Sequence, residues 1–263
     1  MLKKRHFKYF FIVIFLLVLN WGCNDDKEDY QNIARFYYPL ESLTDGGKVY
    51  EFQPVINDTI RAGGTDSMLS VYYKLEYFET DTTPTLITTQ FDVFCRQAAI
   101  YRDEIIKNGV LQQGLRLLEY PNISSDSAVF SDARIINPNV YPYEVRDSSG
   151  FMYRVSWEAP LDKQDRSTLT RVRIFTGMTT HIYKGVPYDA VEFLVKDKIL
   201  SQHPIEGDWT YEYDKIERYA EGLGLVYYTA IGKNNKMVGY ELADMYLMED
   251  FTKKCETLFF NDY

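Results

Sequence analysis

Residues 223–248 read LGLVYYTAIGKNNKMVGYELADMYLM, and this stretch decides the fold class. Two runs rich in Tyr, Val, Leu and Ile flank the polar segment GKNNK at residues 232–236. Aromatic and β-branched residues favour strands. Gly and Asn tolerate the positive φ that tight hairpin turns require. The stretch therefore predicts a β-hairpin and, with it, an antiparallel sheet.

Three other segments, 71–78, 151–157 and 191–196, alternate at period two, as strands with one buried face do. The residues expected on the buried faces are Val71, Tyr73, Leu75 and Tyr77; Phe151, Tyr153, Val155 and Trp157; Val191, Phe193 and Val195. The 23 Tyr and 16 Phe of the 263 residues also suit β-sheets. The predicted fold class is mainly β: an antiparallel sandwich or open half-barrel with one or two short helices.

Other segments are less regular. Residues 91–107 can form either a helix or a strand, and residues 208–221 can hold a helical turn. Segments rich in Pro, Ser or Asp at 121–131, 137–142 and 160–167 indicate loops. Because proline has no N–H to donate, Pro138 and Pro142 limit any strand there to a sheet edge.

The first 22 residues have the order of a signal peptide. Basic residues at positions 3–8 precede an apolar run at 9–19, which is shorter than the ~20 residues that span a bilayer. Gly22 and Cys23 follow, as at the cleavage site of bacterial lipoproteins. We expect cleavage after Gly22 and a lipid anchor on Cys23, where two acyl chains hold a protein stably on a membrane.

A polar and mostly acidic segment follows the anchor. It resembles the surface-export signal of Bacteroidota lipoproteins and consists of Asn24, Asp25, Asp26, Lys27, Glu28 and Asp29. The alternative is a solvated linker. We expect residues 23–33 to be a flexible tether and 34–263 a β-rich domain, with a weak division into about 34–145 and 146–263. The expected location is the outer membrane, facing the exterior, with its periplasmic face as the alternative.

Several short motifs resemble a group of uncharacterised Bacteroidota lipoproteins. They are FYYPL at 36–40, GKVYEF at 47–52, LRLLEYP at 115–121, YAEGLGLVYY at 219–228 and GYEL at 239–242. The YAxGxGLV-type segment is the most specific of these. The resemblance implies a lipoprotein with a β fold, and it carries no catalytic residues. By itself, the pair Gly222 and Gly224 suits a bulge or close packing against another element.

The charge of the chain argues against one class of partner. Removal of residues 1–22 takes away four of the 29 basic residues and none of the 38 acidic ones, which changes the net charge from −9 to −13. Nucleic acid is therefore not an expected partner.

Sites of known chemistry are not evident in the sequence. His181 and His203 lie in unrelated contexts, no G-x-S-x-G segment occurs, and no zinc-ligand spacing is present. We expect no enzymatic activity, no cofactor and no metal. Cys95 and Cys255 either pair in an oxidising envelope or remain free thiols.

Three functional hypotheses remain. The first is a non-enzymatic accessory or binding subunit of a cell-envelope complex with a protein partner. The second is a carrier or sensor of an apolar ligand or lipid, with a concavity lined by residues such as Phe78, Leu117, Phe193 and Leu225. The third is a surface that binds or hydrolyses glycans. The candidate binding residues are Trp157, Trp209, Tyr227 and Tyr228.

Overall fold

The computed structural model describes residues 30–56, 59–60, 70–79, 83–231 and 237–260. The predicted signal peptide, Gly22, Cys23 and the segment 24–29 lie outside the described residues, as does the turn at 232–236. Residues 31–263 belong to one compact unit. The weak division expected near residue 145 falls within that unit.

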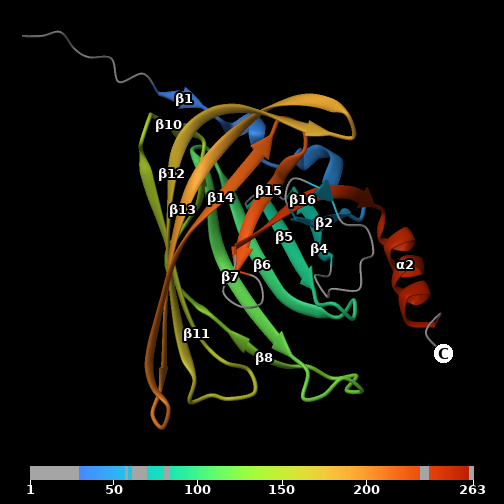
Figure 1. Cartoon of the computed structure of the whole chain (residues 1–263), viewed down its shortest axis with the longest axis vertical. Coiled ribbons are helices and arrows are strands. Elements are labelled where there is room, and N and C mark those ends of the chain that lie inside the picture. Colours follow the sequence, from blue (N-terminus) through green and yellow to red (C-terminus); the bar gives the residue numbers. More distant parts are fainter. Residues whose placement is uncertain (1–29, 57–58, 61–69, 80–82, 232–236, 261–263) are drawn as a thin grey trace, which may run out of the picture. The chain divides into compact units, whose positions relative to one another are not determined.

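Twelve antiparallel strands form a closed ring in this unit (Figure 1). In ring order they are β2 (Lys48–Ile56), β4 (Val71–Phe78), β5 (Thr85–Phe91), β6 (Gln97–Ile106), β7 (Gly109–Glu119), β9 (Arg134–Pro142), β11 (Gly150–Glu158), β12 (Arg166–Tyr183), β13 (Val186–His203), β14 (Gly207–Ala220), β15 (Gly224–Ile231) and β16 (Met237–Tyr246). Short strands β3 (Thr59–Ile60) and β8 (Val129–Asp132) pair with β2 and β7.

The ring closes where β16 pairs with β2, from Gly239 opposite Val55 to Tyr246 opposite Val49. The mainly β, antiparallel class is confirmed, but the sandwich or open half-barrel is wrong. Closure satisfies the backbone N–H and C=O groups that two free edges would leave unpaired.

The predicted hairpin strands are confirmed as β15 and β16, which pair from Ile231 opposite Met237 to Tyr227 opposite Glu241. Gly224 shows the expected close packing, because a Cβ there would come within 2.2 Å of the Tyr38 ring, whereas a Cβ on Gly222 would meet nothing within 4 Å. The nearby bulge between β14 and β15 lies at Val226. Gly224 also has a φ of +84°, which favours glycine.

The expectation of a helical turn in residues 208–221 is wrong. These residues fall almost wholly in strand β14, which pairs with β13 along its length. The segment 91–107, for which helix and strand were both open, takes the strand alternative: Phe91 ends β5, a turn follows and β6 begins at Gln97. The α-helix of the described residues is α2 (Met248–Phe260).

The expectation for Pro138 and Pro142 is also wrong, because the segment 137–142 belongs to β9, which has neighbours on both sides. Pro138 lies opposite Tyr153 of β11, and Pro142 lies opposite Gly109 of β7. Register shifts interrupt both pairings, at Ile136 and at Val140, each two residues before a proline.

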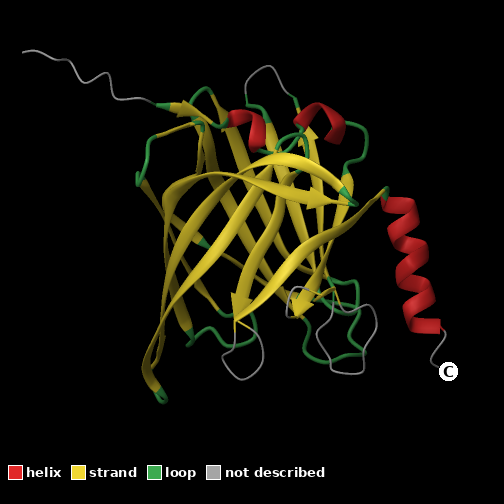
Figure 2. Ribbon diagram, turned by 45° about the horizontal axis from the view of Figure 1, so that its top comes forward, coloured by secondary structure: helices red, strands yellow, loops and turns green. Residues whose placement is uncertain are grey.

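The segment before β2 covers one end of the barrel (Figure 2). It contains the 3-10 helices η1 (Ala34–Phe36) and η2 (Leu40–Leu43). Its start, β1 (Gln31–Asn32), pairs with β10 (Glu144–Val145). Side chains of this segment belong to the main core, together with barrel residues such as Phe175 and Phe193. This end of the barrel is therefore packed.

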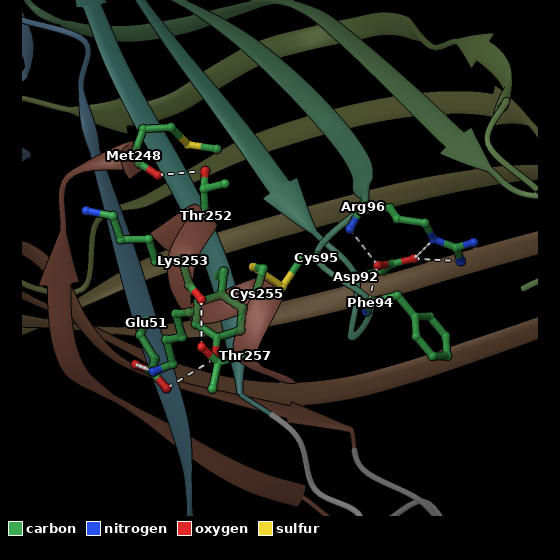
Figure 3. The surroundings of a disulfide bond; sticks show 12 residues. Glu51, Asp92, Phe94, Cys95, Arg96, Met248, Thr252, Lys253, Cys255 and Thr257 are labelled. Atoms are coloured by element: carbon green, nitrogen blue, oxygen red, sulfur yellow. Dashed lines mark hydrogen bonds and ion pairs between the residues drawn. A yellow bond between two sulfur atoms is a disulfide. The ribbon is translucent and has the colours of Figure 1, made fainter. Parts of the chain in front are cut away.

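Helix α2 lies against the outside of the barrel, where Phe251 contacts the rings of Tyr72 and Phe91. A disulfide joins Cys255 of the helix to Cys95 in the turn between β5 and β6, with the Cα atoms 6.1 Å apart (Figure 3). The sequence left open whether Cys95 and Cys255 pair or remain free thiols, and in the structure they are paired.

Candidate functional site

A cavity of about 560 Å³ lies inside the barrel, within the size range of pockets that hold small organic molecules. Its wall is mostly apolar and rich in tyrosine. The apolar and aromatic lining residues are Tyr38, Val71, Tyr73, Tyr101, Leu115, Leu117, Val140, Tyr153, Val155, Trp157, Leu169, Tyr219, Leu225, Tyr228, Ala230 and Tyr240.

The cavity occupies the half of the barrel away from the η1 and η2 helices. Leu115 and Leu117 line it from the part of β7 that leads to its pairing with β8. Trp157 and Leu169 line it from the end of β11 and the start of β12. Tyr38, between η1 and η2, lies where the cavity meets the packed end.

Three charged side chains from adjacent strands form the first part of a buried ionic network. Arg171 donates two hydrogen bonds of 2.7 Å to the carboxylate of Asp197, which lies directly opposite it across β12 and β13. Lys215 of β14 contacts the same carboxylate at 2.9 Å. This fork geometry fixes the orientation of the Arg171 guanidinium.

A second ion pair, Arg173 with Glu217, lies two residues further along β12 and β14. Arg173 Nε donates to Glu217 Oε2 at 2.7 Å, and the hydroxyl of Tyr219 donates to the same oxygen at 3.1 Å. The β9 bulge at Val140 lets its carbonyl accept a 3.2 Å hydrogen bond from Arg173 Nη1.

Asp103 of β6 completes the polar part of the cavity. Its side chain is buried, and it interacts with Gln112, its cross-strand partner on β7, which also accepts a hydrogen bond from the Tyr153 hydroxyl. Its Oδ1 atom has no hydrogen-bond partner. An orphan carboxylate oxygen inside a protein costs free energy, so a group that could bond to it would be favoured there.

The carboxylates of the cavity differ in their pKa values. Burial raises the pKa of Asp103 to about 7, against the weaker opposing effects of Gln112 and Arg173. Burial would also raise the pKa of Asp197, but the hydrogen bonds and charges of Arg171 and Lys215 hold it at about 2. The pKa of Glu217 is lowered because Arg173 and Arg171 outweigh its burial. Near neutral pH, Asp103 is therefore the carboxylate that titrates.

The candidate residues from the sequence divide between the cavity and other places. Trp157 and Tyr228 line the cavity, as do Leu117 and Leu225. Phe193 is in the packed core, and Phe78 is exposed.

The two other candidates are not on the cavity wall. Tyr227 lies under the guanidinium of Arg218, 5.0 Å from its ring centroid. Trp209 is exposed on the hairpin between β13 and β14. The four candidate binding residues therefore do not form one site.

Sequence reasoning missed the ionic residues of the cavity, although a signal for them exists. Asp197 continues the apolar face of Val191, Phe193 and Val195 at period two. Arg173 and Arg171 continue the face of the buried Phe175 in the same way. A charged residue in the buried register of a strand marks a polar interior.

Both histidines of the predicted mature chain interact with neighbouring residues of the fold. His181 is buried, its Nε2 lies 3.6 Å from Glu241, and burial lowers its pKa. His203 Nδ1 accepts hydrogen bonds from the backbone N–H groups of Ile205 and Glu206.

Among the described residues, no group of three or more His, Cys, Asp and Glu side chains is placed to hold a metal ion. In the same part of the chain, every helix is too short or too polar to cross a membrane.

The comparisons with known proteins give likeness in structure only. No protein-family model and no curated protein matches the chain. A protein of Parabacteroides distasonis described as a lipoprotein matches with a TM-score of 0.43 and 15% identity, over 80% of this chain and 97% of its own. An exported protein with a YmcC-like fold from Bacteroides fragilis matches with a TM-score of 0.48 and 11% identity, over 80% and 98%. The protein YmcC of Escherichia coli, described as a hypothetical lipoprotein, matches with a TM-score of 0.31 and 9% identity, over 82% and 88%.

Proposed function

We propose that the protein is a lipid-anchored lipoprotein of the outer membrane that binds a small amphipathic molecule inside its barrel and catalyses no reaction. The observation that carries this proposal is the cavity of about 560 Å³. A well-packed interior has few voids larger than a water molecule. A cavity of this size lacks side-chain contacts that would stabilise the fold, and a bound molecule would supply such contacts.

The wall chemistry indicates what kind of molecule fits. Aliphatic and aromatic side chains such as Leu117, Trp157 and Leu169 make up most of the wall, with a few charged groups at one place. Sites for small molecules combine these two features, because apolar area supplies affinity and a few polar groups fix the orientation. This supports the ligand-binding hypothesis over a purely structural barrel.

The location in the proposal rests on the amino-terminal sequence. The apolar run at 9–19, Gly22 and Cys23 support export and acylation, and the acidic segment 24–29 supports display on the cell exterior. Globomycin, which inhibits the lipoprotein signal peptidase, should leave the precursor uncleaved. If the mature protein instead began at a residue other than Cys23, the proposed lipid anchor on Cys23 would be contradicted.

The binding test uses the mature chain, residues 23–263 with Cys23→Ser, which lacks both the signal peptide and the acyl anchor, with N-phenyl-1-naphthylamine as a neutral fluorescent probe. We expect saturable enhancement of its fluorescence at one probe per chain. Leu169→Trp should weaken the enhancement, because the larger side chain takes up part of the cavity. Thr180→Trp, at an exposed position of the same strand, is the matched control. Equal binding by all three proteins would place the probe outside the barrel and contradict the proposal.

A second candidate function is that of an accessory subunit that docks a protein partner. The hairpin between β13 and β14 projects past the neighbouring strands (Figure 1). It exposes Ile205 by 83%, together with Trp209 and Tyr211. Exposed apolar groups of this kind mark interaction sites.

The test of this second function is purification of the tagged lipoprotein from its native membrane in mild detergent. One partner near equal stoichiometry, lost with Ile205→Ser and retained with the exposed control Thr180→Ser, would support it. Failure to recover a stoichiometric partner would count against it.

A further inference from the structure

The cations of the cavity have hydrogen-bonding capacity to spare. Arg171 lies deep in the barrel, yet 22% of its side-chain surface is free because it borders the cavity. Its Nη1 atom is 3.7 Å from Glu217 Oε1, which is too long for a hydrogen bond. Lys215 also borders the cavity with 15% of its side chain free, and its contact with Asp197 uses one of three N–H groups.

The acceptors are nearly all occupied. Both oxygens of Asp197 bond to Arg171, and both oxygens of Glu217 bond to Arg173. Among the carboxylate oxygens of these three residues, Oδ1 of Asp103 is the one without a hydrogen-bond partner. A molecule that enters the cavity therefore meets cationic donors without full partners and one carboxyl group.

The balance of charge changes with the state of Asp103. Arg171, Arg173 and Lys215 carry three positive charges, which Asp197, Glu217 and an ionised Asp103 balance. When Asp103 is protonated, the set has one excess positive charge, and the carboxyl group can donate a hydrogen bond. The cavity can then accept one negative charge without burying a net charge of its own.

We infer that the cavity selects amphiphilic anions, whose carboxylate, sulfonate or phosphate head contacts Arg171 and Lys215 while an apolar body fills the remainder. This inference rests on the proposed binding function and names its ligand class. Leu115, Leu117 and Leu169 line the part of the cavity that would hold the apolar body.

The opposite choice, an amphiphilic cation bound to Asp103, is less favoured by the geometry. An ammonium group at Oδ1 would gain one carboxylate but would approach Arg173, which interacts electrostatically with Asp103. It would leave the spare donors of Arg171 and Lys215 without acceptors. Repulsion between like charges in a buried site is costly.

Binding of the anion should depend on pH through Asp103. The groups that face Asp103 are Gln112 on β7, Arg173 on β12, Tyr37 beside η1, Tyr101 on β6 and Tyr153 on β11. Asp103 is the one whose pKa, about 7, lies near neutrality. A bound anion favours its protonated form, so binding should be tighter at pH 6 than at pH 8, and Asp103→Asn should remove most of this difference.

The experiment measures displacement of N-phenyl-1-naphthylamine from the Cys23→Ser chain by three ligands of equal chain length: dodecanoate, dodecan-1-ol and dodecylamine. We expect dodecanoate to bind at least about tenfold more tightly than dodecan-1-ol, and dodecylamine to bind most weakly. Equal binding of dodecanoate and the alcohol, or preference for the amine, would overturn the inference and leave the binding function intact. Failure of the probe and all three ligands to bind would contradict the binding function itself.

Variants then locate the head group. Lys215→Gln keeps a donor for Asp197 but removes the charge, so the preference for dodecanoate over dodecan-1-ol should fall about tenfold. Lys198→Gln changes an exposed lysine that pairs with Glu212 on the outside and should leave the preference unchanged. An unchanged preference in Lys215→Gln would overturn the placement of the head group.

Discussion

The packed half and the hollow half of the barrel are built from the same strands but differ in the side chains that point inward. In the packed half, the ring of Phe193 lies 5.8–5.9 Å from the rings of Tyr141, Phe151, Phe175 and Tyr219. In the hollow half, the inward residues of the same strands surround a cavity instead. Strand β13 passes from Phe193 and Val195 to Asp197, and β12 passes from Phe175 to Arg173 and Arg171.

This comparison teaches that stability and binding are separated along the barrel axis. Aromatic packing beneath the η1 and η2 segment holds the ring closed at one end. The ionic network and the cavity, which contribute less to packing, are then free to serve a ligand at the other. The separation makes quantitative predictions, because identical substitutions should differ in cost between the two halves.

The largest expected effect comes from a matched pair of leucine truncations. Leu75→Ala in the packed half removes a side chain with 0% exposure and should lower the free energy of unfolding by about 3–5 kcal/mol. Leu117→Ala on the half-buried cavity wall should cost about 1 kcal/mol, since its surroundings already contain a void. Urea denaturation measures both, and equal costs would break the comparison.

The next effect concerns the ionic network. Asp197→Ala leaves Arg171 and Lys215 without their shared carboxylate, so the free energy of unfolding should fall by about 3 kcal/mol. Glu212→Ala, which removes the exposed partner of Lys198, is the control and should cost less than about 1 kcal/mol. If both substitutions cost the same in urea denaturation, the network is not buried as described.

The smallest effect is a gain in stability. Asp103 has an ordinary pKa of 3.8 when unfolded and a pKa of about 7 when folded. The folded state therefore holds more protons between these values, and the free energy of unfolding falls as pH rises through that window. Asp103→Asn removes this cost, so it should stabilise the protein by about 2 kcal/mol at pH 8 and by less at pH 5. Thermal unfolding of the variant and the unmodified protein at the two pH values measures this difference. A variant less stable than the unmodified protein at pH 8 would contradict the prediction.

The sequence predicted the parts of the fold in which inward residues are apolar. The alternation of Phe151, Tyr153, Val155 and Trp157 is visible because each of these side chains contacts the core or the cavity wall. Strand β14 was obscured for the opposite reason. Lys215 and Glu217 occupy its inward register, so the apolar alternation that marks a strand is interrupted at the site itself.

Ring closure and the cavity could not be predicted from local patterns. Closure depends on the pairing of β16 with β2, whose residues are far apart in the chain, and period two does not specify a partner. Local patterns also do not mark the bulges at Gln113 and Val140, which change the face that the following residues present. Asp197, Arg171 and Arg173 were within reach of sequence reasoning, because each continues an apolar face.

The most direct test of a binding site in the hollow half is a crystal structure of the Cys23→Ser chain with dodecanoate. The account predicts an alkyl chain inside the barrel against Leu117 and Leu169, with its carboxylate within hydrogen-bonding distance of Arg171 and Lys215. Dodecanoate bound only on the outer surface, or a cavity filled by its own side chains, would contradict it.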